Sequence, residues 1–201
     1  MGNRFLGPDA NGVAGLFAKG TYGANFSGDD GMSISDWTLP TFRAPFSAVA
    51  QQGQKISDVK DGTSHTIFIG EMRNSIVVAL DDGRGAWGHV GGCHIHCGSD
   101  PFCSAGIAGC NYNGDPTTVY TPNSKYEVDR PSHCTQSNPL SVNFCVDDND
   151  VSSGMVVRSR HPAGAQICMG DGTVRFVTDD VDVRIWRDMF SSGGGEVFKE
   201  F

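Results

Sequence analysis

The chain has 201 residues, of which 38% are hydrophobic and 27 are Gly, and these values favour one globular domain that is rich in loops. Its formal net charge of −8 argues against a nucleic-acid-binding protein, which needs a basic surface. No stretch approaches the roughly 20 apolar residues that span a bilayer, and no signal peptide follows Met1.

The first part of the chain predicts short strands separated by loops. Residues 1–43 are rich in Gly, Asn and Asp and show no sustained hydrophobic period, so we expect loops with short strands there. Residues 45–52 fit a short helix or turn, and Asp61-Gly62 breaks the chain before the next apolar run. Further short strands are expected at 66–69, 75–80 and 84–90.

Six of the seven Cys residues lie in one insertion at about 91–150, which has little apolar content. Because this insertion cannot bury a core of its own, we expect disulfide bonds to hold it together, although the sequence does not determine their pairing. Disulfides persist outside the cytosol, which predicts an extracellular or cell-surface protein, with the periplasmic side of the envelope as the alternative. The candidate Cys residues are Cys93, Cys97, Cys103, Cys110, Cys134 and Cys145.

The start of this insertion, GCHIHCG at 92–98, also offers metal ligands. His94 and His96 stand between two Cys residues, and zinc prefers this mixture of nitrogen and sulfur donors. The two Cys residues lack the spacing of a zinc knuckle, so we favour disulfides here. Capture of zinc or copper by the two His side chains remains the alternative.

An acidic segment, VDDNDVSSG at 146–154, ends the insertion. Its carboxylates at Asp147, Asp148 and Asp150 have the chemistry that calcium prefers. The Gly and the closing Glu of an EF-hand are missing at the required positions, so the segment is not an EF-hand. We favour a solvated acidic loop, with a simpler calcium site as the alternative.

The segment SRHPAGAQICMGDGTVRFV, residues 159–177, predicts a β-hairpin that turns at Asp171-Gly172, after a short strand at 154–160. A two-residue type I′ turn needs positive φ at both residues and pairs Ile167 with Phe176. Met169 and Val174 then join these two side chains on one apolar face. A three-residue loop would pair Ile167 with Arg175 and mix the faces, so we predict the two-residue loop.

The last predicted element is a helix over residues 181–190. Val181, Ile185 and Met189 recur at i, i+4 and i+8 and therefore share one face. The acidic residues Asp179, Asp180 and Asp182 suit its N-terminal end, and Gly193–Gly195 ends it. The predicted fold is therefore α+β, a single domain over 1–201 with an antiparallel sheet, a C-terminal helix and the disulfide-rich insertion.

Nine residues separate His161 from Asp171, and this pair has two interpretations. It could be a catalytic or ligand-binding pair. We favour the structural interpretation, in which His161 caps the hairpin entrance by bonding to the backbone and Asp171 supplies positive φ.

No other pattern predicts an enzyme. Ser64 and His65 would point to opposite faces of a strand, which is poor geometry for a catalytic triad. Asp61 and Glu71 lie in a strand-turn segment, and we expect them to bond to the backbone or to Arg73.

Two long motifs resemble a known family. One is the H-x(9)-D-G pattern of His161, Asp171 and Gly172, and the other is ISDVKDGTSHTIFIGE at 56–71. RGAW at 84–87 and Pro122-Asn123 follow in the same order. Together they resemble the type IV pilin-like, or pseudopilin-like, proteins of planctomycete type, most of which are classed as a domain of unknown function. The second motif contributes Asp61, Gly62, Thr63, Ser64 and Glu71.

The resemblance covers roughly residues 10–198 and implies a pilin-like head. Such proteins begin with a prepilin leader and a long hydrophobic helix, which this chain lacks, so it resembles the later part of the head. The implied function is a non-enzymatic structural subunit of an extracellular filament or envelope assembly. Its expected partners are copies of itself or related subunits, with no nucleic acid, no membrane contact and no cofactor unless calcium binds. The alternative is an extracellular binding module for a metal, a glycan or a protein.

Overall fold

The computed structural model describes residues 4–8, 14–27, 43–46, 54–73, 84–87, 94–96, 121–124 and 155–195. The strand predicted at 75–80 lies outside these residues, as does most of the short helix or turn predicted at 45–52.

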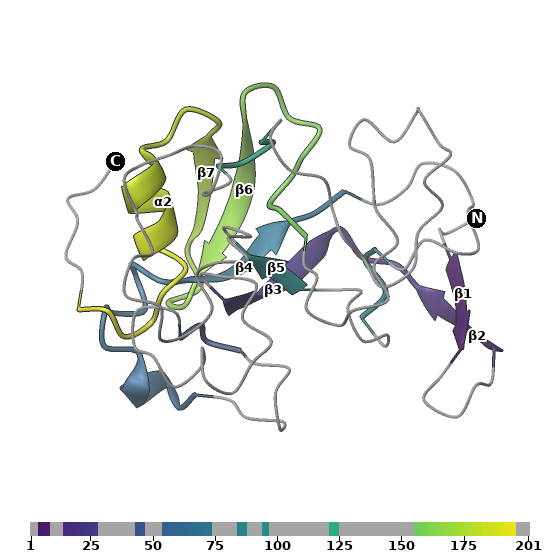
Figure 1. Ribbon diagram of the computed structural model, residues 1–201, viewed down its shortest axis with the longest axis horizontal. Helices are drawn as coiled ribbons and strands as arrows, with labels where there is room; N and C mark the ends of the chain where they lie inside the picture. Colours follow the sequence, from purple (N-terminus) through teal and green to yellow (C-terminus); the bar gives the residue numbers. More distant parts are fainter. Residues whose placement is uncertain are drawn as a thin grey trace, which may run out of the picture.

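The described strands form two sheets (Figure 1). β1 (Arg4–Pro8) and β2 (Ala14–Ala18) make an antiparallel ribbon, which lies at the far end of the molecule from the helix. The main sheet has the order β5-β3-β4-β6-β7. Its four antiparallel strands are β3 (Tyr22–Ser27), β4 (Ile67–Glu71), β6 (Gly164–Met169) and β7 (Val174–Thr178), and β5 (His94–His96) adds to β3 in parallel.

One face of the main sheet carries the hydrophobic core. Alternate side chains of β6 point to this face, and Ala165, Ile167 and Met169 are each at most 1% exposed. They pack with the buried side chains that follow the sheet, above all Trp186 and Phe190, whose rings meet edge to face with centroids 5.1 Å apart.

The helix α2 (Val183–Asp188) is shorter than predicted, and only Met189 of the predicted face is fully buried. The buried anchors are Trp186 in α2 and Met189 and Phe190 directly after it, at i, i+3 and i+4, whereas Val181 and Ile185 pack only at the margin of the core. The large aromatic rings therefore determine which side of α2 faces the sheet, because they bury the most apolar area. Among the residues described, no helix has the length and hydropathy that a membrane span needs.

The expected acidic start of α2 is confirmed at Asp182, which is the N-cap. Its carboxylate accepts hydrogen bonds from the backbone N–H of Arg184 at 2.8 Å and of Ile185 at 3.3 Å. At the other end, the buried amide of Asn25 on β3 donates to the carbonyls of Ile67 and Phe190 at 2.8 and 2.9 Å. This amide ties the end of the helical segment to two strands of the sheet.

The predicted hairpin exists, but the two-residue loop is wrong. The register pairs Ile167 with Arg175 and Cys168 with Val174, so three residues, Gly170 to Gly172, connect the strands. Met169 N donates to Thr173 O at 2.9 Å, and Gly172 has φ +86° while Asp171 does not have positive φ. This is the common three-residue hairpin loop that ends in a left-handed residue.

The change of register reverses the predicted face of β7. Val174 and Phe176 are 64% and 49% exposed on the outer face, whereas Val177 is 1% exposed in the core. Arg175, not Phe176, therefore lies opposite Ile167. A shift of one residue moves every side chain of a strand to the other face. Here the shift buries Val177 in the core and leaves the apolar side chains of Val174 and Phe176 exposed.

In their described parts, two further predicted strands form only isolated bridges. In the segment at 154–160, Met155 bridges to Ile95 of β5, and the following Val156, Val157 and Arg158 are buried without continuing a ladder. In the segment at 84–90, residues 84–87 are described and form one bridge, between Ala86 and Lys19.

Candidate functional site

The two motifs found in the sequence meet where β4 ends and β6 begins. His161 Nε2 lies 3.2 Å from Glu71 Oε1, and because a carboxylate only accepts, the ring nitrogen carries the proton. The other oxygen of the Glu71 carboxylate accepts a hydrogen bond from the backbone N–H of Gln166 at 2.7 Å. We call this arrangement the His161–Glu71 junction.

The junction continues the sheet beyond the last regular pair of β4 and β6. Gly70 is opposite Ile167, so the next N–H of β6 in this direction, that of Gln166, needs an acceptor. The Glu71 carboxylate takes the place of a backbone carbonyl there, while the Glu71 carbonyl accepts from Arg158 N at 2.9 Å. The charged side chain of Glu71 therefore acts as the hydrogen-bond partner that a neighbouring strand would otherwise supply.

The loop between Arg158 and β6 is held by hydroxyl and amide groups. Ser159 Oγ accepts from His161 N at 2.9 Å and donates to the carbonyl of Gly164. Asn123 Oδ1 accepts from Ser159 N at 2.8 Å, and its Nδ2 donates to Gly164 O at 3.2 Å and to Asp179 Oδ1 at 2.9 Å. The Pro-Asn motif therefore serves the same loop as the His161 motif.

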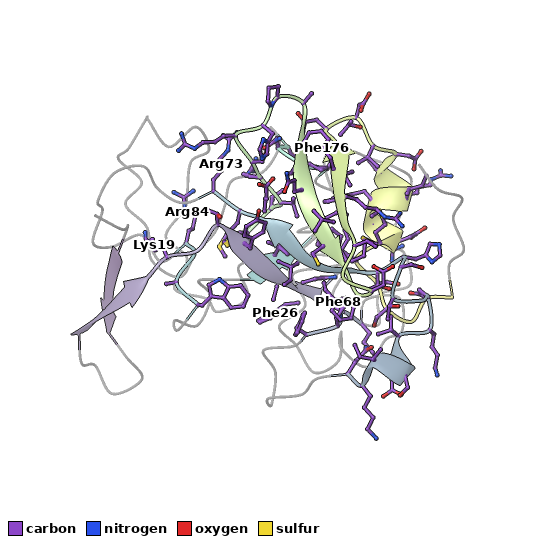
Figure 2. All side chains as sticks on the ribbon, turned by 180° about the vertical axis from the view of Figure 1, so that it is seen from behind. Lys19, Phe26, Phe68, Arg73, Arg84 and Phe176 are labelled. Carbon is purple, nitrogen blue, oxygen red and sulfur yellow. The ribbon has the colours of Figure 1, made fainter. Side chains whose placement is uncertain are left out.

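The imidazole of His161 faces solvent at the edge of the junction. Its side chain is 49% exposed, and that of Glu71 is 13% exposed. The ring also meets Phe176 edge to face at 6.2 Å, and Figure 2 shows Phe176 at the same end of the sheet as Arg73, with Phe68 at the other end. A general base would have to accept a proton from a neighbouring nucleophile, but the nearby Ser159 hydroxyl donates its proton to Gly164 O.

Asp61 holds the segment that follows α2. Its Oδ2 accepts from Ser191 Oγ at 2.8 Å and from Gly194 N at 3.2 Å, and its Oδ1 accepts from Gly195 N at 2.6 Å. The expectation that Asp61 and Glu71 bond to backbone groups is therefore confirmed.

The turn after Asp61 contacts the hairpin tip. Thr63 O accepts from Asp171 N at 3.1 Å, and Thr66 O accepts from Gly170 N at 3.0 Å. The two Asp-Gly turns are thus joined by backbone hydrogen bonds, which the sequence did not indicate.

The structure does not bring His161 and Asp171 together. They lie at opposite ends of β6, a strand of six residues that spans roughly 20 Å. Asp171 instead accepts hydrogen bonds from Thr173 N at 2.9 Å and from Thr173 Oγ1 at 2.7 Å, and these bonds lower the pKa of its carboxyl from the ordinary 3.8. The structural interpretation was right that Asp171 lies in the hairpin turn, but wrong that it supplies positive φ. It was also wrong about the partner of His161, whose ring nitrogen contacts the Glu71 carboxylate and not the backbone.

Ser64 and His65 do not lie on opposite faces, as a strand would require. They belong to the turn before β4, where Ser64 Oγ and His65 Nδ1 are 3.1 Å apart. The same turn is closed by His65 N donating to Gly62 O at 3.0 Å and by Thr66 Oγ1 donating to Gly62 O at 3.1 Å. The contact therefore stabilises a turn that positions Thr63 and Thr66 against the hairpin tip.

Comparison with known families identifies the chain. The model of a family described as protein of unknown function (DUF1559) matches residues 5–184. The chain belongs to the DUF1559 family. No curated protein and no solved structure matches it.

Several predicted sites of this DUF1559 chain lie outside the described residues. They are the six clustered Cys residues Cys93, Cys97, Cys103, Cys110, Cys134 and Cys145, and the acidic residues Asp147, Asp148 and Asp150. His94 and His96 lie in β5, but their side chains are outside the described part. Within the described part, Cys168 is a free thiol, and no group of three or more His, Cys, Asp or Glu side chains could hold a metal ion.

The sequence motifs of this DUF1559 chain did not predict the residues that form hydrogen bonds with the loop before β6. Asn123 has φ +56°, a conformation that Asn tolerates better than most residues, so the Pro-Asn pair was a signal for this loop. Arg158 gave no such signal, because a fully buried Arg that donates to Ser124 O is rare. Only the fold places these residues around the start of β6.

Proposed function

We propose that this chain is the α+β head of a type IV pilin-like subunit, a non-enzymatic structural part of an extracellular filament or envelope assembly. Its partners in this proposal are copies of itself or related subunits, and it needs no cofactor. The proposal places the protein outside the cytosol, where the clustered Cys residues would form disulfides.

One observation supports the proposal: the carboxylate and amide side chains of the described motifs form hydrogen bonds with the protein's own backbone. Asp61, Glu71 and Asn123 accept from N–H groups of distant segments, and Asp171 does the same within its own turn. A catalytic residue needs a polar atom aimed at a substrate, together with a nucleophile or a metal. Side chains that hold turns and strand ends are what a rigid assembly unit requires.

The proposal is tested in the native host. The gene, with all of its upstream coding sequence and a C-terminal epitope tag, is expressed in cells with and without the prepilin peptidase, and surface material is sheared off. We expect the tag in the sheared fraction of normal cells and in the membrane of peptidase-deficient cells. Mass mapping should find the six clustered Cys residues oxidised.

Two results would contradict the proposal. Cytosolic protein with reduced Cys residues would remove the extracellular assignment. A freely secreted protein that binds calcium, zinc or a glycan would replace the structural subunit by the binding module.

A further inference from the structure

We propose that β7 is a docking edge, on which a second copy of this chain adds its own β7 as an antiparallel strand. β7 is the last strand of the main sheet among the described residues. Val174 is 64% exposed and Phe176 is 49% exposed, and the flanking Thr173 and Thr178 are exposed as well. An exposed apolar edge strand is a template for pairing.

The backbone of β7 presents hydrogen-bonding groups to this edge. Thr173 and Asp179 form backbone hydrogen bonds to the other side of the hairpin, at 2.9 and 3.0 Å. Because bonded and non-bonded pairs alternate along an antiparallel ladder, the intervening residues at 174, 176 and 178 direct their N–H and C=O groups away from β6. The Thr178 carbonyl also accepts from Val181 N at 3.2 Å, so its second lone pair is the one left for a partner. The apolar side chains and the outward backbone groups therefore belong to the same residues.

Of the features that protect an edge strand, β7 has a short length and one inward-facing charge, Arg175, but not the others. Its sequence VRFVT contains no Pro and no Lys, and its register with β6 runs over five pairs without a bulge. Its one charged residue, Arg175, is half-buried on the face that carries the core, away from Val174 and Phe176.

The strand is self-complementary, which favours a second copy as the occupant. The outward groups at 174, 176 and 178 are symmetric about Phe176, so a two-fold axis there pairs Phe176 with Phe176 and Val174 with Thr178. Cross-strand aromatic pairs stabilise a sheet. The same register brings Arg175 of each copy diagonally across from Asp179 of the other, so opposite charges face each other twice.

This inference rests on the proposed function, because pairing through β7 would contribute to a filament or envelope assembly only if the chain is such a subunit. The pairing itself is a property of the chain in solution. Failure of the pairing would leave the surface location untouched, and a cytosolic location would leave the pairing untouched, so the two failures are distinguishable.

The test uses the oxidised full chain in sedimentation velocity and amide-exchange NMR, from about 10 µM to about 1 mM, because a short edge gives weak association. We expect a concentration-dependent dimer. The amides of Val174, Phe176 and Thr178 should exchange at least about fivefold more slowly at the high concentration, while those of Arg175 and Val177, which face β6, should not change.

Two variants and one control complete the test. Val174→Lys places a charge on the edge, and Thr178→Pro removes an outward N–H without breaking a bond to β6, so each should raise the dimer dissociation constant at least about tenfold. Ile56→Lys, at a side chain that is 61% exposed away from β7, should leave it unchanged. A monomer at every concentration, a dimer without slower exchange at 174, 176 and 178, or equal effects of Val174→Lys and Ile56→Lys would overturn the proposal.

Discussion

Glu71 and His161 are 90 residues apart in the sequence, yet their side chains meet at 3.2 Å. The same carboxylate binds the backbone N–H of Gln166 at 2.7 Å, so one side chain closes a gap in the sheet and orients an imidazole. The first contact is largely exposed and the second is partly buried. The two contacts should therefore differ in their contribution to stability.

Replacing Glu71 should cost much more stability than replacing His161. Glu71→Ala leaves the Gln166 N–H without its acceptor, which should lower the free energy of unfolding by about 1–3 kcal/mol. His161→Gln removes the exposed contact with Glu71 and the ring contact with Phe176, both made by a half-exposed side chain, and should cost about 0–1 kcal/mol. Urea unfolding of both variants measures the difference. Equal losses would mean that the side-chain contact, and not the backbone cap, holds the junction.

Removing the Asp61 carboxylate should release the segment after α2. Asp61→Ala takes the acceptor from Ser191 Oγ and from the N–H groups of Gly194 and Gly195, so we expect a loss of about 1–3 kcal/mol. Hydrogen exchange at Gly194 and Gly195 should become faster. Asp58→Ala is the matched control, because that exposed carboxylate accepts from the hydroxyl of its neighbour Ser57, at 3.2 Å. Unchanged exchange in Asp61→Ala would contradict the assigned role.

Gly164 and Gly172 should respond differently to substitution by Ala. A Cβ at Gly164 would lie 2.3 Å from Val177 O and 2.6 Å from the Phe176 ring, so Gly164→Ala should cost about 2–4 kcal/mol. A Cβ at Gly172 meets nothing within 4 Å, and its only cost is φ +86°, about 1–2 kcal/mol. Thermal and urea unfolding would compare the two. A smaller loss at Gly164 than at Gly172 would show that the strands separate easily there.

The Asp171 turn should weaken in acid. Its hydrogen bonds to Thr173 lower the folded-state pKa below the ordinary 3.8, so the carboxylate stabilises the fold above that pH. This contribution is lost as the pH falls below 3.8 and through the folded-state pKa. Asp171→Asn removes the charge, and the difference in Tm between the two proteins should be constant above about pH 5 and shrink below about pH 4. A difference that does not change between pH 6 and pH 2 would contradict the assignment.

Asn123 should be needed for its hydrogen bonds more than for its backbone conformation. Asn123→Gly permits φ +56° but loses the bonds to Ser159, Gly164 and Asp179, while Asn123→Ala loses them and adds strain. We expect a loss of about 1–3 kcal/mol in the Gly variant and roughly 1 kcal/mol more in the Ala variant. A Gly variant as stable as the natural chain would show that only φ matters.

Features that depend on neighbouring residues could be predicted from the amino-acid sequence. The hairpin near Asp171-Gly172, the strand before Glu71 and the acidic cap at Asp182 were all predicted, because turns, short apolar runs and N-caps follow from local chemistry. The motif residues were also recognised from the sequence, although their partners were not.

Three other features depend on contacts between distant segments: the register of β7, the buried side of α2 and the His161–Glu71 junction. Val174 and Phe176 are as apolar as core residues, but Trp186 and Phe190 lie on the opposite face, and the larger buried rings decide which face becomes the core. The junction joins segments 90 residues apart, and no local pattern encodes which distant N–H a carboxylate will bind. Burial and hydrogen-bond satisfaction act on the whole chain at once, which is why these features appear only in the fold.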